Sequence, residues 1–109
     1  MAKKIVFIGA GSFTFTRNLT RDILTFDAFK DADLWLVDIN PDNLEIARTM
    51  VQRIVDLGNY PAKVHCTTDR VEALQGGADG VLCTILVGTP DVVRLELDIP
   101  YKYGIDACV

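Results

Sequence analysis

The sequence is poor in the side chains that would assign metal or disulfide chemistry outright. Its 109 residues include one histidine and three cysteines, Cys66, Cys83 and Cys108. No two cysteines form a C-x-x-C pair and no cluster of histidines or carboxylates accompanies them, so the pattern predicts neither a metal site nor a disulfide framework. Unpaired cysteines in an odd number favour a reducing, cytoplasmic setting. We expect Cys66 and Cys83, which lie within apolar stretches, to be buried, and Cys108 to be exposed.

Long apolar runs and an excess of positive charge are also absent. No run approaches the roughly 20 apolar residues of a membrane-spanning helix, and the run at residues 5–8 is too short for the core of a signal peptide. Eleven basic side chains against 15 acidic ones give a net charge of −4, which argues against a nucleic acid or an anionic membrane as the main partner. What is present is a chain that is 50% hydrophobic and 24% charged, as expected for one folded, soluble domain.

Apolar runs alternate with amphipathic stretches along the whole sequence. We predict strands at residues 5–8, 34–37, 63–67 and from 80 to 84 or 85, and helices over residues 13–26, 41–57, 70–75 and 91–103. This alternation predicts an α/β fold, a Rossmann-like parallel sheet with helices on its faces. Because the strands are apolar throughout rather than alternating, we expect both faces of the sheet to be buried. His65, within the third strand, is expected to be structural.

The predicted helices carry signals at their ends and along their faces. Asn40 is expected to cap the second helix, and Gly58 to stop it in a left-handed conformation. Asp69 and Glu72 have the spacing of a capping box, and Pro100 is expected to kink or end the last helix. Helical spacing predicts a buried face at Phe15, Leu19, Ile23 and Phe26 in the first helix, and at Leu44, Ala47, Val51, Ile54 and Val55 in the second.

A glycine-rich turn, Gly9-Ala10-Gly11-Ser12, links the first strand to the first helix. In a dinucleotide-binding fingerprint the first glycine permits the tight turn, the second lets a pyrophosphate approach the backbone, and the helix N-terminus offers free N–H groups to that anion. Ser12 adds a hydroxyl donor at the same point. Thr14 stands where the usual pattern has a third glycine for close helix–strand packing, so the match is partial. The alternative is that Gly9 and Gly11 only make a tight turn.

An acidic residue, Asp38, follows the second predicted strand, where a carboxylate accepts hydrogen bonds from the adenosine ribose hydroxyls. A carboxylate there also repels a 2′-phosphate, and no arginine stands at Ile39 or Asn40 to bind one, so we predict NAD rather than NADP. Taken alone, Asp38 could instead be a capping residue. The order of strand, glycine turn, helix, strand and acid favours nucleotide binding.

The loop after the fourth predicted strand, at residues 84–88, is a weaker candidate. In sheets of this kind the corresponding loop approaches the nicotinamide side of the cofactor, which makes Thr84 and Gly88 candidate contacts. The segment Gly88-Thr89-Pro90 can equally be a plain turn. Both interpretations stay open.

At these residues the sequence resembles the start of family 4 glycoside hydrolases, the group of α-galactosidases, α-glucosidases, α-galacturonidases and 6-phospho-glycosidases. The resemblance rests on residues 5–16 (IVFIGAGSFTFT), 36–40 (LVDIN) and 98–105 (DIPYKYGI), and it covers essentially the whole chain. A Gly-Ala-Gly-Ser turn followed by a threonine is more typical of this family than of the malate and lactate dehydrogenases that share the fold. The resemblance implies NAD contacts at Gly9, Gly11, Ser12, Phe13 and Asp38. The full set of candidate cofactor-binding residues adds Ile39, Thr84 and Gly88.

The resemblance also implies a reaction. NAD oxidises the sugar of an α-glycoside at C3, the C2 proton is removed, the glycosidic oxygen is eliminated, water adds and the hydride returns. A divalent metal, usually Mn²⁺, holds the C2 and C3 oxygens. The family's metal-binding cysteine and histidine and its catalytic base come after position 109. No catalytic or metal-ligating residue is therefore expected in this chain, and Cys108 is not expected to be the family's metal ligand.

Two other functions remain open at this point. A malate- or lactate-type dehydrogenase needs a pair of arginines after the fourth strand, and only Arg94 lies there. The chain could also be a nucleotide-binding module without catalysis. Since a dinucleotide fold has about six strands and the sequence predicts four, we expect residues 1–109 to be an incomplete Rossmann-type domain, inactive without a substrate and metal domain. We also expect a homo-oligomer, because such a sheet has a free edge and uncovered apolar surface.

Overall fold

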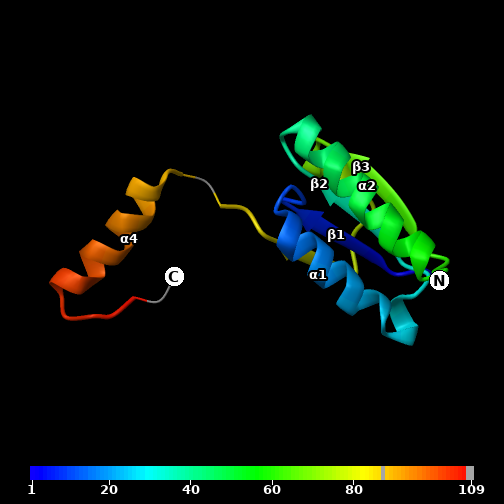
Figure 1. The fold of residues 1–109 in the computed structure, drawn as a ribbon, viewed down its shortest axis with the longest axis horizontal. Helices are drawn as coiled ribbons and strands as arrows, with labels where there is room; N and C mark the ends of the chain where they lie inside the picture. Colours follow the sequence, from blue (N-terminus) through cyan, green and yellow to red (C-terminus); the bar gives the residue numbers. More distant parts are fainter. Residues whose placement is uncertain (87, 108–109) are drawn as a thin grey trace.

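A computed structural model of the chain describes residues 1–86 and 88–107, so Cys108 lies outside the described residues. Strands and helices alternate along this part of the chain (Figure 1). In chain order they are β1 (Lys4–Ile8), α1 (Phe13–Leu24), the 3-10 helix η1 (Asp27–Phe29), β2 (Asp33–Val37), α2 (Pro41–Leu57), β3 (Lys63–Thr67), α3 (Arg70–Leu74), β4 (Gly80–Cys83) and α4 (Pro90–Lys102). No helix of this set is both long and apolar enough to cross a membrane.

The strands form one parallel sheet in the order β3-β2-β1-β4, which confirms the predicted α/β architecture. The predicted strand limits agree with the observed ones to within two residues. At the end of β1, Ile8 pairs with Val37 of β2 on one side and with Cys83 of β4 on the other. The segments that follow these three strands therefore meet at one edge of the sheet.

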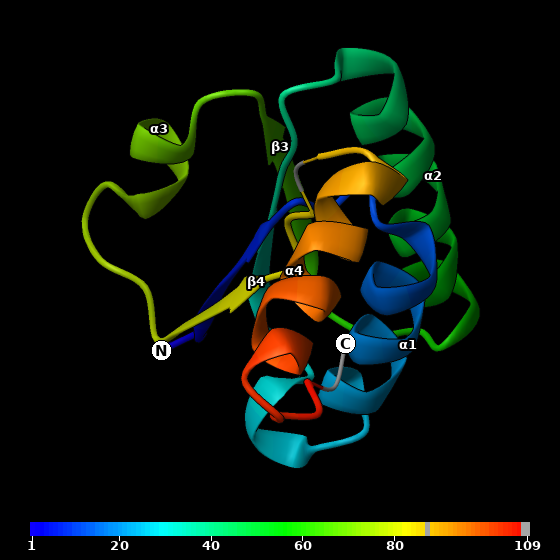
Figure 2. The ribbon, with the colours of Figure 1, turned by 90° about the vertical axis from the view of Figure 1, so that its left-hand side faces the viewer.

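Alternate residues of the strands face two different cores, and Figure 2 shows α1 and α2 on one side of the sheet and α3 on the other. On the first face, Phe7 and Leu36 are fully buried beneath α1 and α2. On the second face, Val6 and Val37 pack with Ala73 of α3. Because α3 is short, it covers only part of this face. Burial on both faces is confirmed for β1 and β2, whereas the edge strands β3 and β4 are half-buried or exposed.

The buried face of α1 differs from the predicted one. The structure buries Thr16, Thr20 and Leu24, whereas Phe15 and Phe26 of the predicted face are exposed. Leu19 and Ile23, the other two residues of the predicted face, do pack against the core. The helix ends at Leu24, so Phe26 no longer shares its face, and the line that approaches the sheet carries small threonines instead of phenylalanines. The first of these threonines, Thr16, lies close enough to the glycine turn for its hydroxyl to donate to the Ala10 carbonyl.

The helix α2 begins as predicted and ends differently. The Asn40 side chain accepts hydrogen bonds from two N–H groups of the first turn, at 3.0 and 3.1 Å. Gly58 has a φ of −84°, and the left-handed residue is Asn59, with a φ of 50°. The left-handed conformation predicted for Gly58 is therefore wrong. A Cβ at position 58 would lie 2.1 Å from Cε2 of Tyr60, so the glycine makes room for this ring.

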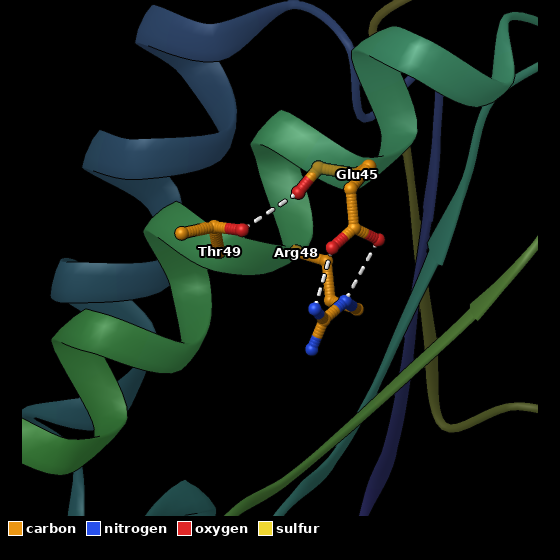
Figure 3. A network of polar contacts seen from close by, with 3 residues as sticks. All are labelled: Glu45, Arg48 and Thr49. Atoms are coloured by element: carbon orange, nitrogen blue, oxygen red, sulfur yellow. Dashed lines mark hydrogen bonds and ion pairs between the residues drawn. The ribbon is translucent and has the colours of Figure 1, made fainter.

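The two faces of α2 have different characters. Leu44, Ala47, Val51 and Val55 are buried, as predicted, and Ile54 is half-buried. On the outer face, the Arg48 guanidinium donates two hydrogen bonds to the Glu45 carboxylate, at 3.0 and 2.5 Å (Figure 3). The Thr49 hydroxyl donates to the backbone carbonyl of Glu45 at 3.0 Å. The bond from Arg48 holds the pKa of the Glu45 carboxyl below its usual range.

Two predictions about the later helices need correction. Asp69 caps α3 by accepting a hydrogen bond from the N–H of Val71 at 2.8 Å. The capping box is only half formed, because the Asp69 N–H donates to the hydroxyl of Thr67, and that hydroxyl in turn donates to Glu72. Pro100 lies inside α4, so the expected end of the helix at this proline is wrong, whereas the alternative of a kink stays a prediction. Proline has no N–H to donate to the carbonyl of residue 96, four residues earlier, yet the helix continues to Lys102.

The two described cysteines lie in different surroundings. Cys66 of β3 faces the core beneath α1 and α2 and is half-buried, and this burial raises the pKa of its thiol. Cys83 was predicted to be buried, but it is exposed. It pairs with Ile8 and therefore shares the second face of the sheet, on the edge strand β4, where α3 leaves the surface open.

Candidate nucleotide-binding site

The candidate site lies at the sheet edge where β1, β2 and β4 end. The glycine turn follows β1, Asp38 and Ile39 follow β2, and Thr84 follows β4. The register of the three strands therefore brings together residues that are far apart in the sequence. Gly88 lies farther on, just before α4, where its φ is 130° and an added Cβ would meet Val92 at 3.2 Å.

Asp38 is bonded to the backbone through both carboxylate oxygens. Its Oδ2 accepts a hydrogen bond from the Gly11 N–H at 2.7 Å, and its Oδ1 accepts one from the Asn40 N–H at 2.9 Å. The first bond joins the end of β2 to the glycine turn, and the second shapes the start of α2. The carboxylate is therefore held at the sheet edge before any ligand is present.

The two glycines of the turn are required for different reasons. Gly9 has a φ of 90°, and an added Cβ would lie 3.1 Å from backbone atoms of Thr84 and Ile85. At Gly11 an added Cβ would lie 2.5 Å from Oδ2 of Asp38 and 3.0 Å from the Cβ of Asn43. We expected Gly11 to admit a pyrophosphate to the backbone. The structure shows that its missing side chain makes room for the Asp38 carboxylate.

The N–H groups of the turn itself are already used within the protein. Those of Gly9 and Ala10 both donate to the carbonyl oxygen of Val37 at 2.9 Å, and that of Ser12 donates to the carbonyl of Gly9 at 3.0 Å. With the Gly11 N–H bonded to Asp38, none of the four faces outward unpaired. An anion at this edge must therefore meet the amides that come next in the chain.

Those next amides belong to the first residues of α1. In the described part of the chain, the backbone N–H groups of Phe13, Thr14 and Phe15 have no hydrogen-bond partner. The Ser12 hydroxyl, at the N-cap position, makes no capping hydrogen bond. Three N–H groups and a hydroxyl at the positive end of a helix form a suitable set of donors for a phosphate.

The side chains around this helix start are open to solvent. Phe13, Thr14 and Phe15 are exposed, so Thr14 meets no strand and the third glycine of the usual fingerprint is not needed for packing here. Ile39 is 91% exposed beside Asp38. The edge thus combines unpaired backbone N–H groups, which are suitable donors for an anion, with a carboxylate that can accept hydrogen bonds from a sugar diol.

One residue of this edge was missed by the sequence analysis. Thr16 is buried on α1, and its hydroxyl donates to the carbonyl oxygen of Ala10 at 2.7 Å. Thr84 makes a similar bond from β4, since its hydroxyl donates to the carbonyl of Gly9 at 3.0 Å. Periodicity analysis gives no weight to a threonine beside an apolar stripe, and no feature of the sequence identified Thr16 as a partner of the turn.

His65 lies on the second face of the sheet, where it contacts side chains of the neighbouring strand β2. Its Nε2 is 3.2 Å from Oδ1 of Asp33, and its ring stacks on Trp35 with 4.8 Å between the ring centroids. The Lys4 ammonium lies 4.8 Å from the Trp35 ring. Within residues 1–86 and 88–107 no group of three or more His, Cys, Asp or Glu side chains could hold a metal ion.

A groove between α1 and α2 lies outside this constellation. Its lining includes Arg17 and Arg21 of α1 and Met50, Arg53 and Leu57 of α2. None of the predicted cofactor-binding residues lines it.

Comparisons with known proteins agree with one another. The family model described as "Family 4 glycosyl hydrolase" matches residues 4–109. An alpha-galactosidase of Rhizobium meliloti (strain 1021) is 39% identical over 106 residues, which are 97% of this chain and 21% of that protein. The chain therefore spans about a fifth of this relative's length.

Two solved structures share the fold. A 6-phospho-alpha-glucosidase from gut microorganisms, in complex with NAD and Mn²⁺, matches 99% of this chain and 24% of its own, with a TM-score of 0.72 and 18% identity. A malate dehydrogenase of Cryptosporidium parvum matches 94% of this chain and 32% of its own, with a TM-score of 0.60 and 24% identity. At these identities the likeness shows the fold alone.

Proposed function

Because the chain belongs to family 4 of the glycosyl hydrolases, we propose that it forms the NAD-binding segment of a longer α-glycosidase. The observation that carries the proposal is the placement of Asp38, whose Oδ2 lies 2.7 Å from the Gly11 nitrogen, at the same edge as the unpaired amides that open α1. The alpha-galactosidase relative and the NAD complex of similar fold support it.

Each part of the dinucleotide has a proposed partner at this edge. Asp38 accepts hydrogen bonds from the adenosine ribose hydroxyls, because a carboxylate has about four lone-pair sites and backbone amides use only one on each oxygen. The amides of Phe13, Thr14 and Phe15, with the Ser12 hydroxyl, take the pyrophosphate. Gly88, before α4, is proposed to lie on the nicotinamide side.

The chemistry follows from the family. NAD, when bound, supplies the hydride acceptor for transient oxidation of the sugar at C3, which makes the C2 proton acidic enough for elimination of the glycosidic oxygen. The residues of this chain bind and orient the dinucleotide. We place the Mn²⁺ ligands, the base and the α-glycoside site in the longer protein. The unpaired cysteines support a cytoplasmic setting for it.

The preference for NAD over NADP tests the proposed site, and the test needs only the 109-residue chain. We expect calorimetry to give at least about tenfold tighter binding of NAD, since like charges about 4 Å apart repel by ~4 kcal/mol near a protein surface. Asp38→Asn is expected to weaken NAD binding and to narrow the difference in affinity between NAD and NADP. Asp42→Asn, which removes an exposed carboxylate at the start of α2, should leave the difference unchanged. Equal affinity of the unaltered chain for NAD and NADP would contradict the proposal.

The activity is tested on the longer protein. A panel of p-nitrophenyl α-glycosides, with and without a 6-phosphate, is offered with NAD, Mn²⁺ and a reductant. We expect release of p-nitrophenol from at least one sugar that depends on both NAD and the metal. No such release from any α-glycoside would rule out the proposed activity without bearing on nucleotide binding by this segment.

A further inference from the structure

The glycine turn is held by side chains from three different elements. The Thr84 hydroxyl after β4 donates to the Gly9 carbonyl at 3.0 Å, and the Thr16 hydroxyl of α1 donates to the Ala10 carbonyl at 2.7 Å. Asp38 after β2 accepts from the Gly11 N–H at 2.7 Å. Three consecutive residues of the turn thus each have a side-chain partner.

These bonds fix whole peptide groups, not single atoms. In a trans peptide the carbonyl of one residue and the N–H of the next point in opposite directions within one plane. The Ala10 carbonyl and the Gly11 N–H belong to the same plane, so Thr16 and Asp38 hold its two ends. The preceding plane is held likewise: its Gly9 carbonyl accepts from the Thr84 hydroxyl and from the Ser12 N–H, and its Ala10 N–H donates to the Val37 carbonyl.

Loss of the Thr16 hydroxyl would free one end of a plane, and loss of the Thr84 hydroxyl would leave the Gly9 carbonyl with only the bond from the Ser12 N–H. Without Thr16, the plane that bonds Asp38 can rotate, and the carboxylate loses its fixed position. Thr16 is 1% exposed, so water does not readily replace its hydroxyl as a donor.

We propose that Thr16 and Thr84 are positioning residues of the dinucleotide site, which hold the two peptide planes of the glycine turn so that Asp38 and the first amides of α1 are aligned for the ligand. The inference rests on the proposed binding of NAD. It assigns Thr84 a role in orienting the turn in place of the direct cofactor contact expected from the sequence. It adds Thr16 to the site without requiring either hydroxyl to touch NAD.

The chain contains a matched control on the same helix. Thr20 lies one turn after Thr16 on α1 and is also fully buried. Its hydroxyl has no hydrogen-bond partner among the residues described. Thr20→Val and Thr16→Val therefore make the same chemical change at similar depth, but only the second removes a bond to the turn.

The test compares NAD affinity by calorimetry across five variants whose folding is checked by circular dichroism. We expect Thr16→Val and Thr84→Val each to weaken NAD binding about tenfold, the loss of roughly one well-placed hydrogen bond. Thr16→Ser and Thr84→Ser keep the donor and should restore most of the affinity. Thr20→Val should bind as the unaltered chain does. If Thr16→Val does not fold, Thr84→Val at the half-buried strand end decides the question.

A second measurement follows the turn directly. We expect the Gly11 amide to exchange its hydrogen faster in Thr16→Val than in Thr20→Val, because its bond to Asp38 is loosened. Valine variants that bind NAD as tightly as the unaltered chain, or serine variants as weak as the valine ones, would overturn this inference alone. An unaltered chain that does not bind NAD would overturn the proposed function itself.

Discussion

At the residue scale, Asp38 connects the two halves of the candidate site. Its position after an apolar run was enough to identify it in the sequence, because an acid at the end of the second strand is part of the fingerprint. Its bonds to the N–H groups of Gly11 and Asn40 could not be predicted, since they depend on how closely the turn approaches β2. Which residues contact NAD stays a prediction.

The two described cysteines should differ in reactivity. Cys66 is half-buried and burial raises the pKa of its thiol, whereas Cys83 is exposed on β4. Because the thiolate is the reactive form, we expect iodoacetamide at pH 8 to alkylate Cys83 about tenfold faster than Cys66. Peptide mass spectrometry resolves the two sites, and in urea they should react alike. Equal rates in the folded chain would contradict the exposure assigned to Cys83.

At the element scale, the strands were predictable and the helix faces less so. Continuous apolar runs located β1, β2 and β4 to within two residues, and the shorter mixed segment KVHCT located β3. The buried face of α1 was missed because Phe15 and Phe26 outweigh Thr16 and Thr20 in any hydrophobic count. A tertiary contact decides which side of a helix is buried, and propensity does not report it.

The end of α2 gives a prediction about packing. Gly58→Ala should destabilise the fold by about 1–2 kcal/mol, because its Cβ would lie 2.1 Å from the Tyr60 ring and displace it. In a Tyr60→Ala background the same change should become neutral or stabilising, since φ at position 58 is −84° and alanine favours helix. Urea unfolding of the unaltered chain, the two single variants and the double variant measures both effects. A destabilisation of the same size in both backgrounds would exclude the clash with Tyr60.

The start of β4 gives a prediction about pH. Asp79 accepts a hydrogen bond from the Lys4 N–H at 2.8 Å, and this bond, with the nearby Lys3 ammonium, lowers the pKa of its carboxyl. A group with a lowered folded-state pKa stabilises the fold above its unfolded pKa of about 4, and this contribution is lost as the pH falls further. We expect the urea midpoint to fall less between pH 7 and pH 3 in Asp79→Asn than in the unaltered chain.

A matched control for this effect is Glu45→Gln. The pKa of Glu45 is also lowered, but its partner Arg48 lies in the same helix, so it joins no separate elements (Figure 3). We expect its contribution to the pH dependence to be smaller than that of Asp79. An unchanged pH dependence in Asp79→Asn would show that this carboxylate does not link β1 to β4.

At the scale of the whole molecule, the chain is more extended than a compact domain. The radius of gyration of its Cα atoms is 16.4 Å, against about 13 Å expected for this length. The cause is α4, which stands apart from the sheet and has no buried residue (Figure 1). Val92, Leu95 and Ile99 form an exposed apolar stripe along it.

These open surfaces predict that the chain associates with a second copy of itself. Besides the α4 stripe, Val81 on the edge strand β4 is half exposed on the face that α3 leaves open. Light scattering of the 109-residue chain should give a mass above the 12.0 kDa of a monomer. Leu95→Glu should lower that mass by placing a charge within the stripe. A monodisperse monomer of the unaltered chain would contradict the expectation.

The central claim is that the edge formed by the ends of β1, β2 and β4 binds NAD, and amide chemical shifts test it most directly. NAD is titrated into the ¹⁵N-labelled chain. The account predicts that the largest changes fall on the amides of residues 9–15 and 38–40, and that those of α3 and of the groove between α1 and α2 change little. Saturating NAD that leaves residues 9–15 and 38–40 unshifted, or that shifts mainly the groove beside Arg17 and Arg53, would contradict it.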